Sequence, residues 1–337
     1  MIEGIFGVMD LTSGYHQAPL DWAFKVLTAF ICFYGIFQFT RLPFGPRRAP
    51  SYFQEMMATV VLVGLIYISC EMYLDDCIVY GRGNDEFLER LELVFQRFRR
   101  YGLYLKAKKC KFGMKLIDYV GRVISAEGIS MSKQKIESVI KFPKPTTEKA
   151  LQSLLGLANY FRSFVPFHTD IVAPLQRMLV PLGKRKAPLV WTEEAYNAFF
   201  KIKQAISKCP LLHFVDEISP IELFTDASDY GIGGMLIQIV GGVSNPISFV
   251  SKSLNSSQVK WSTIQKEAYA IYYCCKQLDP LLRDRKFTIH TDHKNLTFLN
   301  QDPSAMVNRW AMALQELEYT VHFMAGDRNT IADYVRT

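Results

Sequence analysis

The stretch CEMYLDDCIVYG, residues 70–81, sets two adjacent aspartates, Asp75 and Asp76, between two apolar runs. Each run alone has the composition of a buried strand. Carboxylates are rare in such surroundings unless a partner compensates their charge. A β-hairpin would carry both aspartates at its tip, where they can reach solvent or a metal ion. The alternative is an ordinary surface turn, where aspartate is common.

A third aspartate, Asp10, ends another strand-like run, IFGVMD, at residues 5–10. Carboxylates brought together from two strand ends repel one another unless a cation binds. Oxygen ligands suit Mg²⁺, and two such ions can clamp the attacking and leaving oxygens of a phosphoryl transfer. Asp10, Asp75 and Asp76 therefore form a candidate two-metal site.

Four more acids follow or interrupt apolar elements in the second half of the chain. They are Asp226 in IELFTDAS, Glu267 in STIQKEAYAIYY, Asp292 in KFTIHTDHKNL and Asp333 in NTIADYV. For each acid alone, a solvated strand end or helix face is the simpler interpretation. Their joint pattern indicates a second metal cluster, with Glu267 expected at the margin of the core because apolar residues surround it on a helix.

Composition limits the class of protein. A chain of 337 residues is too long for one ordinary core, and 49% hydrophobic residues exclude a disordered chain. The formal net charge of +7 permits a polyanionic partner without requiring one. Seven scattered cysteines with no CxxC pair speak against a zinc site or disulfide framework and favour reduced intracellular thiols.

Periodicity predicts an α+β chain of several domains. Apolar residues at helical spacing predict helices over residues 85–101, 191–206 and 262–278, and a mainly helical segment at 126–185. Strands are predicted at 221–225, 286–291 and directly after the glycine-rich residues 231–234. Two uncharged stretches, residues 26–40 and 56–70, are shorter than the roughly 20 residues of a membrane span. We expect both to be buried core.

Three motifs in the first half, in this order, resemble the palm of reverse transcriptases, specifically those of gypsy-type LTR retrotransposons. They are MDLTSGYHQ (9–17), RLPFGPRRAPSYFQ (41–54) and YLDD (73–76). YVGRVISAEGI (119–129) and LQSLLGLANYFRSFV (151–165) are similar to the strand before the thumb and the thumb helix. FTDASDYGIGGML, QKEAYAI, HTDHKNL and AGDRNTIADYV resemble the four acidic motifs of the ribonuclease H domain that follows.

The resemblance implies a domain order. We expect a palm with an antiparallel sheet, helices and partial fingers at 1–125, a helical thumb at 126–185, a connecting segment at 186–218 and a mixed α/β ribonuclease H-like domain at 219–337. Because the chain starts only nine residues before Asp10, we expect an N-terminally truncated Pol region with most of the fingers missing.

The resemblance also implies the chemistry: an RNA-directed DNA polymerase coupled to a ribonuclease H, each site with two Mg²⁺ or Mn²⁺ ions. Seven residues would be catalytic metal ligands: Asp10, Asp75, Asp76, Asp226, Glu267, Asp292 and Asp333. Four would bind the nucleotide, with the first excluding a ribose 2′-OH: Tyr15, Phe44, Gly45 and Gln54. Plain core packing is the alternative for Tyr15 and Phe44.

A basic stretch with interleaved aromatics suits contact with phosphates. The candidates are Arg97, Lys106, Lys108, Lys109, Lys111 and, on the thumb, Arg162. A solvated helix face and loop is the alternative for each of them. The resemblance implies as partners an RNA template, a DNA primer, an RNA·DNA hybrid, deoxynucleoside triphosphates and the protease and integrase of the same polyprotein, with no membrane.

Two narrower readings stay open. In the first, only the ribonuclease H is active, because the fingers are missing. In the second, the chain is a catalytically dead relic that binds nucleic acid. In either case we expect an intracellular protein, cytoplasmic in a virus-like particle and with access to the nucleus.

Overall fold

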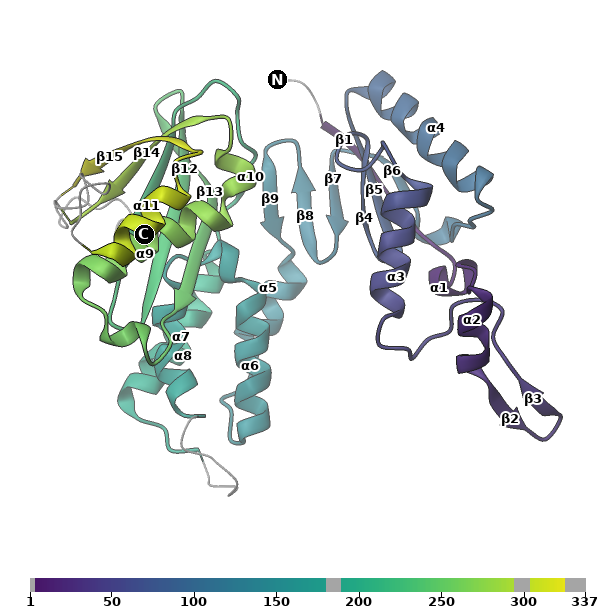
Figure 1. The fold of residues 1–337 in the computed structure, drawn as a ribbon, viewed down its shortest axis with the longest axis horizontal. Coiled ribbons are helices and arrows are strands. Elements are labelled where there is room, and N and C mark those ends of the chain that lie inside the picture. Colours follow the sequence, from purple (N-terminus) through teal and green to yellow (C-terminus); the bar gives the residue numbers. More distant parts are fainter. Residues whose placement is uncertain (1–3, 180–188, 294–303, 325–337) are drawn as a thin grey trace. The chain divides into compact units, whose positions relative to one another are not determined.

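The computed structural model describes residues 4–179, 189–293 and 304–324 (Figure 1). Asp333 lies outside these residues. The chain divides into two compact units, residues 1–127 and 128–337. We call them the first and the second unit.

An antiparallel sheet with the strand order β4-β5-β1-β6 forms the centre of the first unit. Its strands are β1 (Gly4–Asp10), β4 (Cys70–Tyr73), β5 (Asp76–Arg82) and β6 (Lys111–Met114). β4 and β5 form the hairpin predicted for residues 70–81, and β1 pairs with β5. The sheet therefore brings two distant stretches of sequence, the first ten residues and the YLDD motif, side by side.

Helices cover one face of this sheet and a hairpin covers the other. Helices α3 (Ala49–Met56) and α4 (Asn84–Arg100) bury their apolar residues against β1, β4 and β5. On the second face, Phe6 and Ile78 pack against Ile117 of the hairpin β7 (Leu116–Tyr119) and β8 (Arg122–Ser125). The helix predicted at 85–101 is confirmed as α4, and Gly102, at φ +65°, turns the chain away after its end.

The expectation that residues 26–40 are buried core is wrong. They form η1 (Val26–Thr28) and the ribbon β2 (Phe30–Cys32) and β3 (Gly35–Phe37), whose side chains are all exposed. A two-stranded ribbon has no interior of its own and buries apolar residues only against another layer. The second uncharged stretch, 56–70, is divided: Met57 and Leu62 are buried, whereas Val63 and Tyr67 are exposed.

Short elements complete the first unit. They are α1 (Gly14–Gln17), α2 (Trp22–Lys25), the π-helical turn η2 (Met57–Val61) and η3 (Ala107–Lys109). η3 lies against the end of β1, since the Lys106 N–H donates to the Asp10 carbonyl, and Gly14 of α1 lies against Asp75.

The second unit begins with a helical layer. Its helices are α5 (Lys133–Ile140), α6 (Glu148–Tyr160), η4 (Arg162–Phe164), α7 (His168–Arg177) and α8 (Glu193–Ser207), and its two short strands are β9 (Gly128–Met131) and β10 (Leu212–His213). Leu151 and Leu154 form an apolar face of α6 and, with Phe161 just after it, are fully buried. Thr192 caps α8, its side chain accepting from the backbone N–H of Ala195.

A five-stranded mixed sheet with the order β13-β12-β11-β14-β15 follows. Its strands are β11 (Ile221–Ala227), β12 (Gly231–Val240), β13 (Val243–Ser253), β14 (Lys286–Thr291) and β15 (Glu318–Phe323). β11, β12 and β13 are antiparallel neighbours, whereas β14 runs parallel to β11 and β15 parallel to β14. The ends of β11 and β14 therefore lie at the same edge.

Helices pack on both faces of this sheet (Figure 1). One face is covered by α9 (Thr263–Gln277), α10 (Asp279–Leu282) and α11 (Ala305–Ala313), with the short turn η6 (Gln258–Lys260) leading into α9. On the other face, Phe224 and Met235 join the core of the helical layer. The glycine-rich start of β12 permits the close approach of α9 on the first face, because a Cβ at Gly234 would lie 2.5 Å from the Cys274 sulfur.

Two candidate carboxylate sites

The first candidate site lies at the tip of the β4–β5 hairpin. Asp10, the last residue of β1, is paired in register with Asp76, the first residue of β5, and Asp75 lies in the turn between the strands. The backbone N–H of Leu11 donates to the Asp75 carbonyl oxygen at 3.0 Å. Sheet register therefore places the three predicted carboxylates at one sheet end.

Two residues of the sequence motifs support this tip. Gln54 on α3 donates to the Met72 carbonyl and accepts from the Leu74 backbone N–H, both at 2.8 Å. Gly14 lies against Asp75, and a Cβ at that position would be 2.2 Å from Asp75 Oδ1. Any side chain at position 14 would therefore clash with the Asp75 carboxylate, which explains the glycine in MDLTSGYHQ.

The electrostatics of the first site favour a cation. Burial raises the pKa of Asp75, and the charges of Asp10 and Asp76 raise it further. Burial and the charge of Asp10 also raise the pKa of Asp76. Asp75 Oδ1 is buried with no hydrogen-bond partner. A metal ion would satisfy this oxygen and neutralise the mutual repulsion.

A lysine already contacts this site. Lys109 Nζ lies 2.7 Å from Asp10 Oδ2, and this hydrogen bond raises the pKa of the lysine. The backbone N–H of Lys106 donates to the Asp10 carbonyl at 2.8 Å, which holds η3 beside β1. Lys109, which the sequence suggested as a phosphate contact, is thus the counter-ion of Asp10.

The predicted nucleotide-binding residues are partly brought together. The Tyr15 ring lies 5.2 Å from that of Phe44 and 5.3 Å from that of Phe53. Burial, and then the charge of Asp75, raise the pKa of Tyr15, so this tyrosine borders the carboxylates. Phe44 is exposed, and Gly45 follows it at φ +112°. Gln54 instead binds the hairpin backbone.

Sequence reasoning gave no role to Gln17, which ties two segments together below Asp10. Its amide donates to the carbonyls of Thr12 (2.5 Å) and Tyr104 (3.0 Å), and its oxygen accepts from the Tyr104 N–H at 2.6 Å. The partners are backbone groups 5 and 87 residues away, so no local pattern indicates them.

The second candidate site lies at the carboxyl ends of β11 and β14. Ligand oxygens of Asp226, Glu267 and Asp292 all lie within 4.8 Å of one another. Asp226 is on β11, Asp292 directly follows β14 and Glu267 is on α9. Among the residues that the structure describes, these three acids form the group whose ligand oxygens all lie within that distance. The carboxylate oxygens of Asp10, Asp75 and Asp76 do not meet this criterion.

Glu267 is the buried member of the second site. Its side chain is 3% exposed, so the expectation that it lies at the core's margin is wrong. Burial, and then the charges of Asp226 and Asp292, raise its pKa to about 9. Its Oε1 accepts from the Ala227 N–H at 3.1 Å, and its Oε2 is buried without a partner. A cation fits this oxygen.

Asp226 shares this environment. Burial raises its pKa most, the charge of Asp292 raises it further and that of Asp170, on α7, adds a smaller effect. Asp170 was not among the predicted residues. Asp333, the fourth predicted acid, lies outside the described residues.

The predicted nucleic-acid contacts fall into two groups. Lys106, Lys108 and Lys111 are exposed and Arg97 is half-buried in the first unit, and their contact with phosphates stays a prediction. Arg162 in the second unit instead donates to the Ser251 carbonyl oxygen. That bond ties η4 to β13.

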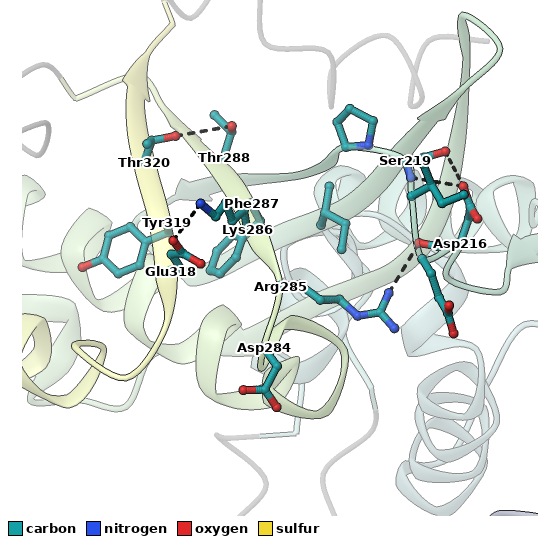
Figure 2. Close-up of a pocket in the computed structure, with 14 residues that line it drawn as sticks. Asp216, Ser219, Asp284, Arg285, Lys286, Phe287, Thr288, Glu318, Tyr319 and Thr320 are labelled. Carbon is teal, nitrogen blue, oxygen red and sulfur yellow. Dashed lines mark hydrogen bonds and ion pairs between the residues drawn. The ribbon is translucent and has the colours of Figure 1, made fainter.

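A cavity of about 620 Å³ lies at the other end of the second unit's sheet, where β11, β14 and β15 begin (Figure 2). Three of its charged side chains are engaged: Lys286 pairs with Glu318 at 3.0 Å, and Arg285 donates to the Asp216 carbonyl at 3.4 Å. This cavity is separate from the carboxylate cluster, which lies at the opposite strand ends.

No helix in the described ranges combines the length and apolar character needed to cross a membrane.

Comparison with known families gives two matches. Residues 3–124 match the reverse transcriptase (RNA-dependent DNA polymerase) family, and residues 216–319 match the RNase H-like domain found in reverse transcriptase. Together they cover both candidate sites, and the first match ends close to the boundary between the two units.

Curated relatives extend the similarity across the chain. The Pol polyprotein of the Drosophila melanogaster transposon 297 is 33% identical over 97% of this chain, and that of transposon gypsy 29% identical over 97%. The Tf2-3 transposon polyprotein of Schizosaccharomyces pombe is 28% identical over 98%. The chain spans 30%, 32% and 25% of the lengths of these relatives.

Solved structures agree on the fold. The foamy viral protease-reverse transcriptase in complex with an RNA/DNA hybrid superposes with a TM-score of 0.76 at 22% identity, covering 96% of this chain and 44% of that one. The predicted α+β multidomain class and the predicted resemblance are both confirmed. The chain carries a reverse transcriptase domain and an RNase H-like domain, and over nearly its whole length it is similar to the Pol polyproteins of gypsy-type and Tf2 retrotransposons.

Proposed function

We propose that this chain is the polymerase and nuclease part of a retrotransposon Pol polyprotein. It copies RNA into DNA in the first unit and cuts the RNA strand of an RNA·DNA hybrid in the second. The observation that carries the nuclease is the convergence of Asp226, Glu267 and Asp292 within 4.8 Å. Three acids from separate elements, one of them buried with a free oxygen, suit divalent cations and little else.

In the nuclease site these three acids would hold two Mg²⁺ ions, with Asp333 as a fourth ligand. Bound ions of this kind lower the pKa of water and stabilise charge on a phosphodiester. Glu267 must lose its proton to bind a cation, because its pKa in the metal-free site is about 9. Ala227 holds Oε1, which leaves Oε2 for the ion.

In the polymerase site Asp10, Asp75 and Asp76 would hold the ions that support attack of a primer 3′-hydroxyl on a deoxynucleoside triphosphate. Tyr15, beside Asp75, would meet the sugar and exclude a ribose 2′-OH. Phe44 and Gly45 would line the nucleotide. We assign Gln54 the support of the aspartate turn, since both its hydrogen bonds go to the hairpin backbone.

The proposed partners are an RNA template, a DNA primer, the hybrid product and deoxynucleoside triphosphates. One structural relative is in complex with an RNA/DNA hybrid and another with double-stranded DNA. Arg97, Lys106, Lys108 and Lys111 would contact phosphates, which fixes position without reading sequence. We further propose that the chain works in a cytoplasmic virus-like particle with access to the nucleus, beside the protease and integrase of the same polyprotein.

A cleavage assay tests the nuclease. The chain is incubated with Mg²⁺ and a hybrid labelled on its RNA strand, and the same assay is run with Asp226→Asn. We expect cleavage by the wild type and loss of at least about a hundred-fold in the variant, because one cation ligand loses its charge. Glu137→Gln, an exposed acid of the same unit, is the matched control. An intact hybrid after incubation with a folded wild type rejects the nuclease.

A second candidate function is a nuclease without polymerase activity. Two observations favour it: the first-unit acids are less tightly gathered than the second-unit triad, and Lys109 binds Asp10. Primer extension decides between the two, with Asp75→Asn as the negative control. Extension by the wild type alone supports both activities, whereas hybrid cleavage without extension leaves only the nuclease. Hybrid binding with neither reaction identifies a catalytically dead relic.

A further inference from the structure

The turn between β11 and β12 immediately follows Asp226, and Ser228 closes it. The Ser228 N–H donates to the Gly231 carbonyl at 2.8 Å. Ser228 Oγ accepts from the N–H groups of Tyr230 (3.2 Å) and Gly231 (3.0 Å). One hydroxyl thus organises the turn next to a proposed cation ligand.

Helix α7 approaches this turn from the helical layer. Ser228 Oγ donates its proton to Asp170 Oδ1 at 2.7 Å. One residue earlier, Thr169 Oγ1 donates to Ser251 Oγ at 3.1 Å, with both side chains buried. The packing has no spare room, since a Cβ at Gly231 would lie 2.8 Å from Thr169 Cγ2 and 3.1 Å from Asp170 Oδ1.

We propose that Asp170 is a positioning residue of the nuclease site and acts through Ser228. This inference rests on the proposed ribonuclease H function. The Ser228 hydroxyl has one proton and two acceptors in reach, Asp170 Oδ1 at 2.7 Å and the Gly231 carbonyl at 3.2 Å. By taking that proton at the shorter distance, Asp170 directs both lone pairs of the hydroxyl toward the two backbone N–H groups. The turn then fixes Asp226 and the Ala227 N–H, which holds Glu267. Asp170 thereby orders two of the three acids without touching a cation, as outer-shell partners of metal ligands do.

Asp170 lies in a different part of the chain from the acids that it positions. It lies outside residues 216–319, which match the RNase H-like family, and 58 residues before Ser228. The nuclease site of this chain is therefore completed by a residue of the preceding helical layer. A second clamp, the 2.8 Å pair between Asp229 and Lys266, holds the same turn from α9.

Cation binding and cleavage are measured together in the full chain. Asp75→Asn and Asp76→Asn are built into every variant so that cations bind mainly at the nuclease site. Mn²⁺ is titrated by electron paramagnetic resonance, and the Mg²⁺ concentration for half-maximal hybrid cleavage is determined in parallel. We expect Asp170→Ala to weaken Mn²⁺ binding and to raise that Mg²⁺ concentration by about ten-fold. Glu137→Ala, an exposed acid of the same unit, should change neither.

Three further variants separate positioning from charge and from folding. Asp170→Asn should keep most of the Mn²⁺ affinity, since its amide oxygen still accepts from Ser228. Ser228→Ala should weaken Mn²⁺ binding at least as much as Asp170→Ala, because it also removes the acceptor of two backbone N–H groups. The double variant should bind Mn²⁺ no more weakly than Ser228→Ala, because Asp170 acts only through Ser228. Where Asp170→Ala fails to fold, Ser228→Ala decides the case, because wild-type Mn²⁺ affinity in folded Ser228→Ala also overturns the inference.

Either of two results in the Asp170 variants overturns the inference: wild-type Mn²⁺ affinity in folded Asp170→Ala, or an Asp170→Asn variant as weak as Asp170→Ala. Failure of the proposed function is distinguishable. If the unsubstituted chain leaves the hybrid intact, the nuclease is rejected, while the Mn²⁺ titrations still report whether Asp170 orders the carboxylates.

Discussion

Glu267 combines deep burial with two neighbouring carboxylates, which is costly for the folded protein without a cation. Folding raises its pKa from about 4.3 in an open chain to about 9. Between these values the folded state holds more protons than the unfolded state. Stability therefore falls as pH rises through this window, the opposite of a salt-bridged acid.

This linkage gives the first prediction. In EDTA, the free energy of unfolding of the second unit should fall between about pH 5 and pH 9, with a slope of up to about 1.4 kcal/mol per pH unit from this group. Glu267→Gln should flatten the slope, because glutamine does not titrate, and saturating Mg²⁺ should flatten it in the wild type. Denaturant unfolding across the pH range measures this. Identical slopes in wild type and variant would disprove the assigned pKa.

In the first site, the charge of one acid is balanced by Lys109. Its ammonium binds Asp10, so a cation entering that site must compete with it. We predict that Lys109→Ala tightens Mn²⁺ binding there about two- to five-fold, the range expected for an exposed ion pair. The titration is done in an Asp226→Asn background to weaken the nuclease site. Lys108→Ala, an exposed neighbour, is the control. Weaker binding in Lys109→Ala would instead make the lysine a support of the site.

At the scale of elements, the β4–β5 hairpin shows how a turn is held in shape. Its turn includes Leu74 at φ +53°, a conformation that costs free energy in a residue other than glycine. The Gln54 amide accepts from the N–H of Leu74 itself and donates to the carbonyl of Met72, two residues earlier. Gln54 of α3 therefore holds the turn in a backbone conformation that the residues of the hairpin do not favour by themselves.

We predict that Gln54→Ala destabilises the first unit by about 1–3 kcal/mol, because it leaves buried backbone groups without partners. Primer extension should fall more than stability alone explains, since Asp75 loses its fixed position. Gln96→Ala, which removes an exposed bond to Glu92 on α4, should alter neither property. Unfolding in denaturant and single-nucleotide extension measure the two effects. Full extension by Gln54→Ala would show that the turn holds its own shape.

Elements with a strong local signal were predictable from sequence. α4 and α8 show apolar residues at helical spacing, and Thr192 marks the start of α8. Residues 26–40 have equally apolar composition but form an exposed ribbon, because composition does not tell whether a second layer covers a strand pair. The sequence correctly predicted Glu267 on a helix. Its burial depends on the sheet that α9 packs against, so the helix sequence alone does not predict it.

At the scale of the molecule, both sites follow one rule: an acid that ends a strand meets another acid through sheet register. Asp10 meets Asp76 through an antiparallel pair, and the parallel pairing of β11 and β14 puts Asp226 and Asp292 at one edge. The sequence could predict these acids because each interrupts an apolar run. Asp170 escaped prediction because it lies in none of the motifs and its partner is 58 residues away. Gln17 closes the MDLTSGYHQ motif, but its role depends on Tyr104, 87 residues away.

The net charge of +7 bears on how the whole chain holds a polyanion. If Lys106, Lys108 and Lys111 contact phosphates, replacing all three by glutamine releases up to three fewer counter-ions on binding. The slope of log affinity against log salt for a hybrid should then become shallower by about two to three. Lys133, Lys149 and Lys201 are exposed lysines of the second unit, and their triple glutamine variant has the same net charge. Fluorescence anisotropy between about 50 and 200 mM salt compares the two. A purely global effect of charge would weaken both variants equally, whereas local contact lowers the slope only in the first.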